Sequence, residues 1–284
     1  MKIDYTIPEI TPYINWAYFF HAWGTAGMTA ADKQRLQAEA EERLERYATS
    51  YRTHALFRLF DAYSRGDDIV VVRPVKDSGI ASQVTIPCLR QQQEGSELLC
   101  LADFIGSDTY LRTSHGSPRA SVNNTIGLFA TSVDAAMERD FCDDPYEKMM
   151  MQVLADRLAE ATAECLHQQV RTRFWGYAPN EQLTIADLLS ERWQGIRPAV
   201  GYPSLPDTSI NFLIDHLLNF HQIGIRLTAS GAMRPHASVS GLMMAHPDAR
   251  YFSVGTIGDD QLSDYARRRG LPLVIVRKYL AGNL

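Results

Sequence analysis

The sequence lacks several features that define familiar classes of protein. Its 284 residues contain four cysteines, none of them in a C-x-x-C pair: Cys88, Cys100, Cys142 and Cys165. This spacing argues against a zinc site or a disulfide framework, so we expect the cysteines to be small buried residues. The net charge is −5 and no long basic run exists, which argues against binding nucleic acid through its phosphates.

Long apolar runs are also missing. No stretch approaches the roughly 20 residues that cross a bilayer, and no apolar segment of the kind found in a signal peptide follows the opening MKIDYTIPEI. We therefore expect no membrane contact and a cytoplasmic protein. Hydrophobic residues make up 45% of the chain, which is enough for a substantial core. Because neither repeats nor linkers divide the sequence, we expect a single α+β domain over residues 1–284.

Local patterns predict a mixture of helices and strands. The Ala-, Glu- and Arg-rich run 29–50 predicts a surface helix. Strands are predicted at 69–73, 84–89, 224–228, 237–245 and 251–257, and further helices at 209–220 and 259–269. Asp259 is expected to cap the last of these helices and Gly270 to end it. The closing LPLVIVRKYL fits either a strand or a short helix.

The clearest helix begins at Asp144. Pro145 at the first helical position and Glu147 three residues after the cap form a capping-box pattern. Apolar residues then recur at helical spacing: Met150, Leu154, Leu158, Ala161 and Cys165. A second stripe is polar: Asp156, Glu160, Glu164 and His167. Spacing alone predicts that this stripe faces solvent; the alternative is the wall of a ligand site.

The densest run of unusual residues is the RPAVGYP segment, residues 197–203. Two prolines and a glycine restrict the backbone, so we expect a stiff loop. Arg197 offers a planar fork of donors to a carboxylate, and Tyr202 offers a ring for stacking or a hydroxyl. The loop therefore suits a ligand with a carboxylate and a flat ring. An ordered turn with Arg197 in a surface ion pair fits equally well.

A second run, residues 227–241, is rich in small and hydroxyl side chains. Such residues let backbone groups approach a ligand closely, as adenine and ribose recognition often requires. His236 and His246 could serve as metal ligands or acid–base groups, but no third ligand has suitable spacing, so we expect no metal site. No Ser–His–Asp or Cys–His arrangement points to a catalytic nucleophile.

Several longer motifs are spread over nearly the whole chain. In chain order they are YINWAYFF, LRQQ, LADF, ADRLAEA, FWGYAPNE, RPxxGYP, AMxPxxSVSG, HPxxxYFxVG and DQLSDYARR. In these motifs and in their order, the sequence resembles the activation domain of cobalamin-dependent methionine synthase. Many long motifs in one order are far more specific than any single pattern.

The resemblance implies a curved α+β fold with a central antiparallel sheet flanked by helices. It also implies that S-adenosylmethionine binds in a shallow groove and presents its methyl group to cobalamin. In that reading Arg197 holds the methionine carboxylate, the loop residues Ala199, Gly201 and Tyr202 lie along the ligand, and Tyr251, Phe252 and Ser253 border the adenosine. Asp156 and Glu160 would lie toward the cofactor side, and Asn15 stands where the family has an aspartate that helps to hold the donor. The resemblance implies no catalytic side chain and no metal ligand.

Four positions depart from the family pattern. Asn15 replaces an aspartate, Ala229 a glutamate, Phe252 a common tyrosine and Thr208 a frequent histidine. The loss of negative charge at Asn15 predicts weaker binding of a ligand that carries an ammonium and a sulfonium.

The DxHxxG motif of cobalamin domains is absent. We therefore expect cobalamin only through a partner, a cobalamin-binding methionine synthase chain, with flavodoxin or a similar reductant as a second partner. The expected function is reactivation of that partner in methionine biosynthesis, by reductive methylation of cob(II)alamin. The alternatives are a non-catalytic docking protein and a reactivator of another corrinoid methyltransferase.

Overall fold

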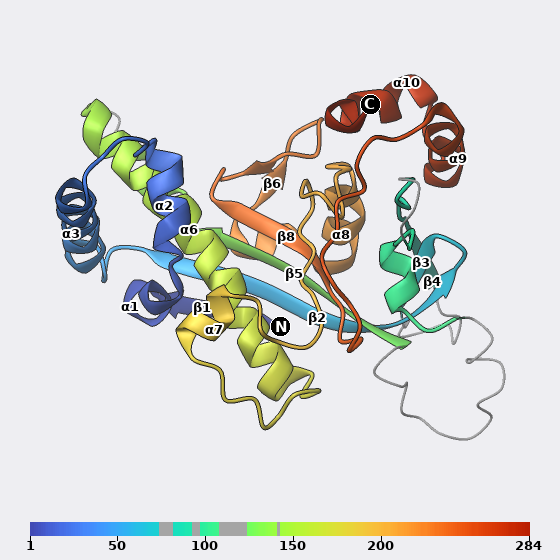
Figure 1. The fold of residues 1–284 in the computed structure, drawn as a ribbon, viewed down its shortest axis with the longest axis horizontal. Coiled ribbons are helices and arrows are strands. Elements are labelled where there is room, and N and C mark those ends of the chain that lie inside the picture. Colours follow the sequence, from blue (N-terminus) through green and yellow to red (C-terminus); the bar gives the residue numbers. More distant parts are fainter. Residues whose placement is uncertain (74–81, 93–96, 108–123, 141–142) are drawn as a thin grey trace.

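The computed structural model describes residues 1–73, 82–92, 97–107, 124–140 and 143–284. A six-stranded antiparallel sheet lies at its centre (Figure 1). Its strands follow the order β4 (Ser82–Pro87), β3 (Asp68–Arg73), β2 (Arg52–Arg65), β5 (Thr125–Val133) and β8 (Ser238–Met243), and β1 (Lys2–Thr6) pairs with the beginning of β2. A separate hairpin joins β6 (Arg226–Leu227) to β7 (Met233–Arg234).

Helices surround this sheet. They are α1 (Ile7–Ile10), α2 (Trp16–Trp23), α3 (Ala30–Arg46), α5 (Ala136–Arg139), α6 (Pro145–Gln169), α7 (Ile185–Leu189), α8 (Ile210–Leu218), α9 (Asp259–Arg269) and α10 (Leu273–Tyr279). A π-helical turn at Val170–Phe174 extends α6, and short 3₁₀ turns lie at Thr11–Tyr13, Leu101–Phe104, Phe220–Ile223 and Ala281–Asn283. None of the helices in the described ranges could cross a membrane.

The central strands bury side chains on both faces of the sheet. Phe57 and Phe129 belong to the apolar cluster that includes α6, whereas their neighbours Leu56 and Leu128 belong to the cluster that includes α8. This arrangement follows from the strand period of two, which sends successive side chains to opposite faces. Helix α6 therefore covers one face and α8 the other.

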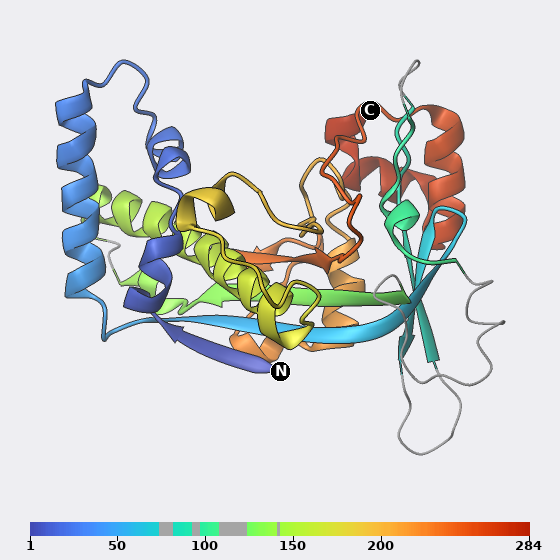
Figure 2. The ribbon, with the colours of Figure 1, turned by 60° about the horizontal axis from the view of Figure 1, so that its bottom comes forward.

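Figure 2 shows the curvature of the molecule. The long strands β2 and β5 form a base, from whose two ends α3 and the pair α9 and α10 rise on the same side. The expected fold, a curved α+β structure with a central antiparallel sheet flanked by helices, is thus confirmed.

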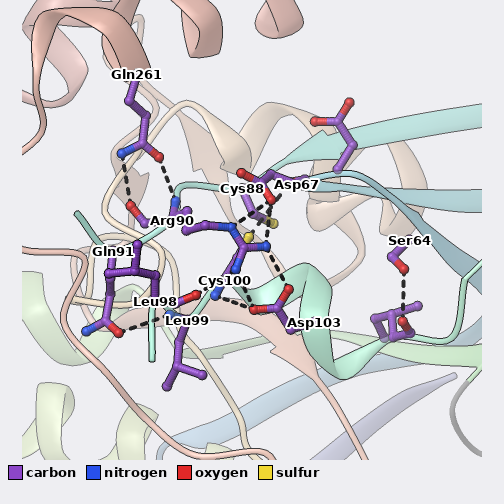
Figure 3. Close-up of polar contacts among 12 residues, drawn as sticks. Ser64, Asp67, Cys88, Arg90, Gln91, Leu98, Leu99, Cys100, Asp103 and Gln261 are labelled. Carbon is purple, nitrogen blue, oxygen red and sulfur yellow. Dashed lines mark hydrogen bonds and ion pairs between the residues drawn. The ribbon is translucent and has the colours of Figure 1, made fainter. Parts of the chain in front are cut away.

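The LRQQ and LADF motifs join the C-terminal helices to the sheet (Figure 3). The guanidinium of Arg90 donates to the carboxylates of Asp67 and Asp103, with its Nη2 2.7 Å from an oxygen of each. The side chain of Gln261, on α9, accepts from the Arg90 amide at 2.7 Å and donates to its carbonyl at 2.9 Å. These motifs therefore act in folding, and the side chain of Gln91 also donates to the carbonyl of Ser253 at 2.8 Å. None of their residues lines the cleft described below.

Several predicted elements are confirmed. The helix predicted at 29–50 is α3, Asp144 caps α6, and Gly270 ends α9 in a left-handed conformation. The structure also contains β3, β4, β8 and α8 near their predicted positions, and the closing segment forms α10. Cys88, Cys100 and Cys165 are buried as expected, whereas Cys142 lies outside the described residues.

Other predictions are wrong. Residues 251–257 form no strand, and only Arg226–Leu227 of the predicted strand 224–228 is paired. Glu147 completes no capping box because its carboxylate binds the guanidinium of Arg43 on α3. Helix α9 is preceded by Gly258 as its cap, so Asp259 is the first helical residue instead.

Candidate ligand cleft between α6 and the 197–203 loop

A cleft of about 680 Å³ lies between α6 and the RPAVGYP loop, residues 197–203. Members of segments 13–18, 188–193 and 251–253, together with Ser204 and Val239, provide the rest of its wall. This volume is typical of sites for small ligands and cofactors. The structure therefore brings the predicted loop, the acidic helix and the N-terminal motif to one place.

The loop is fixed because it runs along the outer edge of β8. The amide of Val200 donates to the carbonyl of Ser240 at 2.9 Å, and the amide of Leu242 donates to the carbonyl of Pro198 at 3.0 Å. Gly241 permits this approach, since a Cβ atom there would lie 2.2 Å from the Pro198 oxygen. The sheet edge thus sets the position of the loop, as the stiff sequence predicts.

The segment after β8 is fixed against the same loop. The amide of Arg197 donates to the hydroxyl of Tyr251 at 2.9 Å, and the amide of Val254 donates to the carbonyl of Pro203 at 3.0 Å. The amide of Phe252 donates to the Ser204 hydroxyl at 3.2 Å. These bonds hold residues 251–254 beside the cleft although they belong to no strand.

A buried ion pair connects the loop to α6. Nη2 of Arg197 lies 3.0 Å from Oε2 of Glu164, and the two side chains are only 13% and 9% exposed. Burial lowers the pKa of the guanidinium, but the combined effects of Glu164, Tyr251 and Glu160 outweigh it, so the pKa of Arg197 is raised. Arg197 therefore stays charged at the cleft.

The position of Glu164 corrects the prediction of a solvent-facing polar stripe on α6. Glu164 is 7% exposed and His167 is fully buried, while Asp156 and Glu160 are half-buried. The stripe shares one face of the helix, as its spacing predicts, but the loop covers part of that face. The ion pair of Arg197 is buried as well, in contrast to the alternative of a surface pair.

Charged groups around the cleft are mixed in sign. Three carboxylates, Glu160, Glu164 and Glu191, face two guanidiniums, Arg157 and Arg197. Burial raises the pKa of Glu191, although the nearby charge of Arg197 opposes this. A cleft with an excess of one negative charge favours a ligand with net positive charge.

A family model described as the activation domain of vitamin B12 dependent methionine synthase matches residues 6–270. The chain belongs to this family. Among solved structures, it is similar to a crystal structure of the MetH reactivation domain bound to AdoHcy. The two chains are 37% identical, the similarity covers 100% of this chain and 90% of the other, and the TM-score is 0.88.

Most predicted site residues of this activation domain lie at the cleft. Its wall includes Asn15, Glu160, Arg197, Ala199, Tyr202, Tyr251, Phe252 and Ser253. Gly201 belongs to the loop but not to the wall; its φ of +90° turns the chain toward Tyr202. The hydroxyl of Tyr202 donates to the carboxylate of Glu160, so the loop and α6 are joined across the cleft wall.

The structure also assigns a local role to Asn15. Its side-chain oxygen accepts from the amide of Ala17 at 3.1 Å and so caps α2. The NH2 group of the Asn15 carboxamide, a donor, therefore remains available to the cleft. An aspartate at this position would offer a second acceptor oxygen there instead. This difference agrees with the expectation of weaker binding to a cationic ligand.

The small-residue run 227–241 contributes little to the cleft. Within the described residues, Val239 is its one member in the wall. Thr208 and Ala229 also lie outside the wall: the Thr208 hydroxyl donates to the carbonyl of Ser230 at 3.0 Å. Two of the four departures from the family pattern therefore affect a turn beside α8.

Sequence reasoning missed two cleft residues in particular, Glu191 and Trp193. Glu191 adopts a φ of +56°, which is uncommon for a residue with a side chain. Neither residue stands in an unusual sequence pattern, so only the fold reveals them. No group of three potential metal ligands occurs within the described ranges, and Nδ1 of His236 lies 3.2 Å from Asp156 instead.

Proposed function

We propose that this activation domain binds S-adenosylmethionine in the cleft and delivers its methyl group to the cobalamin of a separate methionine synthase chain. The observation that carries the proposal is the position of Arg197 at a cleft of suitable size and charge. The similar MetH reactivation domain, crystallised with AdoHcy, supports it.

The cleft fits the chemical groups of the donor. S-adenosylmethionine has one carboxylate, one ammonium and one sulfonium, and therefore a net charge of about +1 at neutral pH, opposite to the cleft. Arg197 uses one N–H of each terminal nitrogen within the protein, toward Glu164 and His167. Because each terminal nitrogen of a guanidinium has two N–H groups, two donors remain for a carboxylate.

The remaining roles follow from the walls of the cleft. Glu160 and Asn15 would face the positively charged part of the ligand, and Tyr202 would lie along it. Tyr251, Phe252 and Ser253 would border the adenosine. When bound, the donor supplies an electrophilic methyl group to a cobalamin that has taken up one electron, and S-adenosylhomocysteine remains. The protein contributes placement and orientation, with no acid–base step.

Two measurements test this proposal. Calorimetric titration of the full chain with S-adenosylmethionine should show binding at one site. Incubation with a cobalamin-bound methionine synthase, a flavodoxin-type reductant and methyl-labelled donor should then transfer label to the corrinoid. Binding without any transfer would refute the catalytic part, and absence of binding by the folded chain would refute the whole proposal.

A second candidate, a docking protein that has lost the donor, is favoured by one observation. Asn15 replaces an acidic side chain with one whose oxygen already caps α2. The substitution Asn15→Asp separates the two candidates: a donor-binding domain should bind S-adenosylmethionine more tightly after it, whereas a docking protein should bind the ligand neither before nor after.

A further inference from the structure

Arg197 is held by a chain of hydrogen bonds that begins beneath the cleft, on the fully buried His167. Nη1 of Arg197 lies 3.2 Å from Nδ1 of His167. A guanidinium can only donate, so Nδ1 must accept and the imidazole proton must reside on Nε2. Nε2 lies 3.4 Å from the hydroxyl of Tyr177, toward which it then donates.

The far end of the chain returns to the segment that contains Arg197. The hydroxyl of Tyr177 donates to the carbonyl of Gln194 at 3.3 Å. Gly195 leaves room for it, since a Cβ atom there would lie 3.0 Å from that hydroxyl. Segment 194–197 is thus held at both ends, by Tyr177 at the carbonyl of Gln194 and by His167 at the guanidinium.

The contacts around His167 favour one protonation state. Its ring packs edge-on against Trp193, with centroids 5.4 Å apart, and the charges of two guanidiniums act on it. Burial, with Arg197 and Arg171 nearby, lowers the pKa of His167 well below its ordinary value. A neutral imidazole is the form that can accept from Arg197.

Stability alone gives a poor account of this arrangement. The Oε1 atom of Glu164 is buried and has no hydrogen-bond partner among the described residues. A buried ion pair with an unsatisfied oxygen is often no more stable than apolar residues of similar volume. The pair and the hydrogen bond from Arg197 to His167 do, however, fix the direction of a charged group in the wall of the cleft.

From this geometry we infer that His167 and Tyr177 are positioning residues, which orient the guanidinium of Arg197 toward the carboxylate of the ligand. The inference rests on the proposed binding of S-adenosylmethionine. It predicts that substitutions of these two residues weaken the binding of ligands that have an amino-acid tail and leave the binding of ligands without one unchanged. The ligand 5′-methylthioadenosine has the adenosine part and the sulfur but no tail, so it provides the internal control.

The substitutions His167→Leu and His167→Asn form a matched pair. The leucine and asparagine side chains are similar in size, but the asparagine oxygen can take the place of Nδ1 as an acceptor for Arg197. Calorimetry on the full-length variants should show about a tenfold rise in the dissociation constant of S-adenosylmethionine for His167→Leu, because a bond to a charged donor is lost. His167→Asn should recover most of the affinity. Binding of 5′-methylthioadenosine should stay within about twofold in both.

Three results would overturn the inference while leaving the proposed function intact. These are equal affinities of the Leu and Asn variants for S-adenosylmethionine, equal losses for both ligands, or no loss at all. Tyr177→Phe, which removes a single hydroxyl, tests the same idea if His167→Leu does not fold; a smaller loss, about threefold and again confined to the ligand with a tail, is expected. Failure of the wild-type chain to bind S-adenosylmethionine would refute the proposed function itself.

Discussion

The contact of the RPAVGYP loop with β8 should make Gly241→Ala strongly destabilising. The added Cβ atom would lie 2.2 Å from the carbonyl oxygen of Pro198 and 2.9 Å from Cα of Ala199. Both contacts are with backbone, so the loop must move away from the strand. The move would break the two hydrogen bonds that join Val200 to Ser240 and Leu242 to Pro198.

The expected cost follows from those bonds. Each contributes about 1 kcal/mol, and a buried amide left unpaired at Val200 adds about 1 kcal/mol, so the free energy of unfolding should fall by about 3 kcal/mol. Urea denaturation measures this loss. Because the loop also supplies Arg197 and Tyr202, affinity for S-adenosylmethionine should fall as well.

A matched control is Gly270→Ala, at the end of α9. Gly270 has a φ of +65° and open space around it, so alanine there should cost about 1 kcal/mol through backbone conformation alone. That variant should lose stability and keep its affinity for the ligand. A Gly241→Ala protein with wild-type stability and wild-type affinity would show that the loop is not held by β8 as described.

Three further predictions concern the charges of the cleft. Arg197→Lys keeps a charge beside Glu164 but loses the planar fork of donors. Calorimetry should therefore show a rise of about 10- to 100-fold in the dissociation constant of S-adenosylmethionine, with little change in that of 5′-methylthioadenosine. As the pH falls below about 6.5, unfolded His167 takes up a proton that the buried ring resists; denaturation should show stability declining by up to about 1.4 kcal/mol per pH unit, and His167→Asn should lack that part of the slope. Added NaCl should weaken binding of S-adenosylmethionine more than binding of the product S-adenosylhomocysteine, a zwitterion with no net charge, as measured by calorimetry.

Helices with clear caps were predictable from the sequence. Thr29 and Asp144 stand before long helical patterns, and their side chains accept hydrogen bonds from amides of the first helical turn. Gly270 follows such a pattern and adopts the left-handed conformation that often ends a helix. The capping box at Glu147 failed for a tertiary reason. Its carboxylate binds Arg43 on another helix, a contact that no local pattern contains.

The central strands were harder to predict. Nearly every residue of β5 is buried, so its sequence TIGLFATSV shows no alternation of polar and apolar side chains. The opposite error occurred at residues 251–257, where aromatic and β-branched residues suggested a strand. There the backbone bonds to Pro203 and to the Ser204 side chain, and those partners cannot be read from composition.

The polar stripe of α6 shows why helical spacing does not determine environment. Glu160 and Glu164 lie one turn apart on the same face, yet Glu164 is the more deeply buried because the segment that leads to Arg197 covers the second half of the helix. That segment is tied to the residue that directly follows β8, by paired bonds between Ile196 and Met244 at 2.9 and 3.0 Å. The same segment therefore buries the carboxylate and brings its countercharge. A loop motif can locate Arg197 in the sequence, but the residues that orient it depend on which turn of α6 lies beneath the loop.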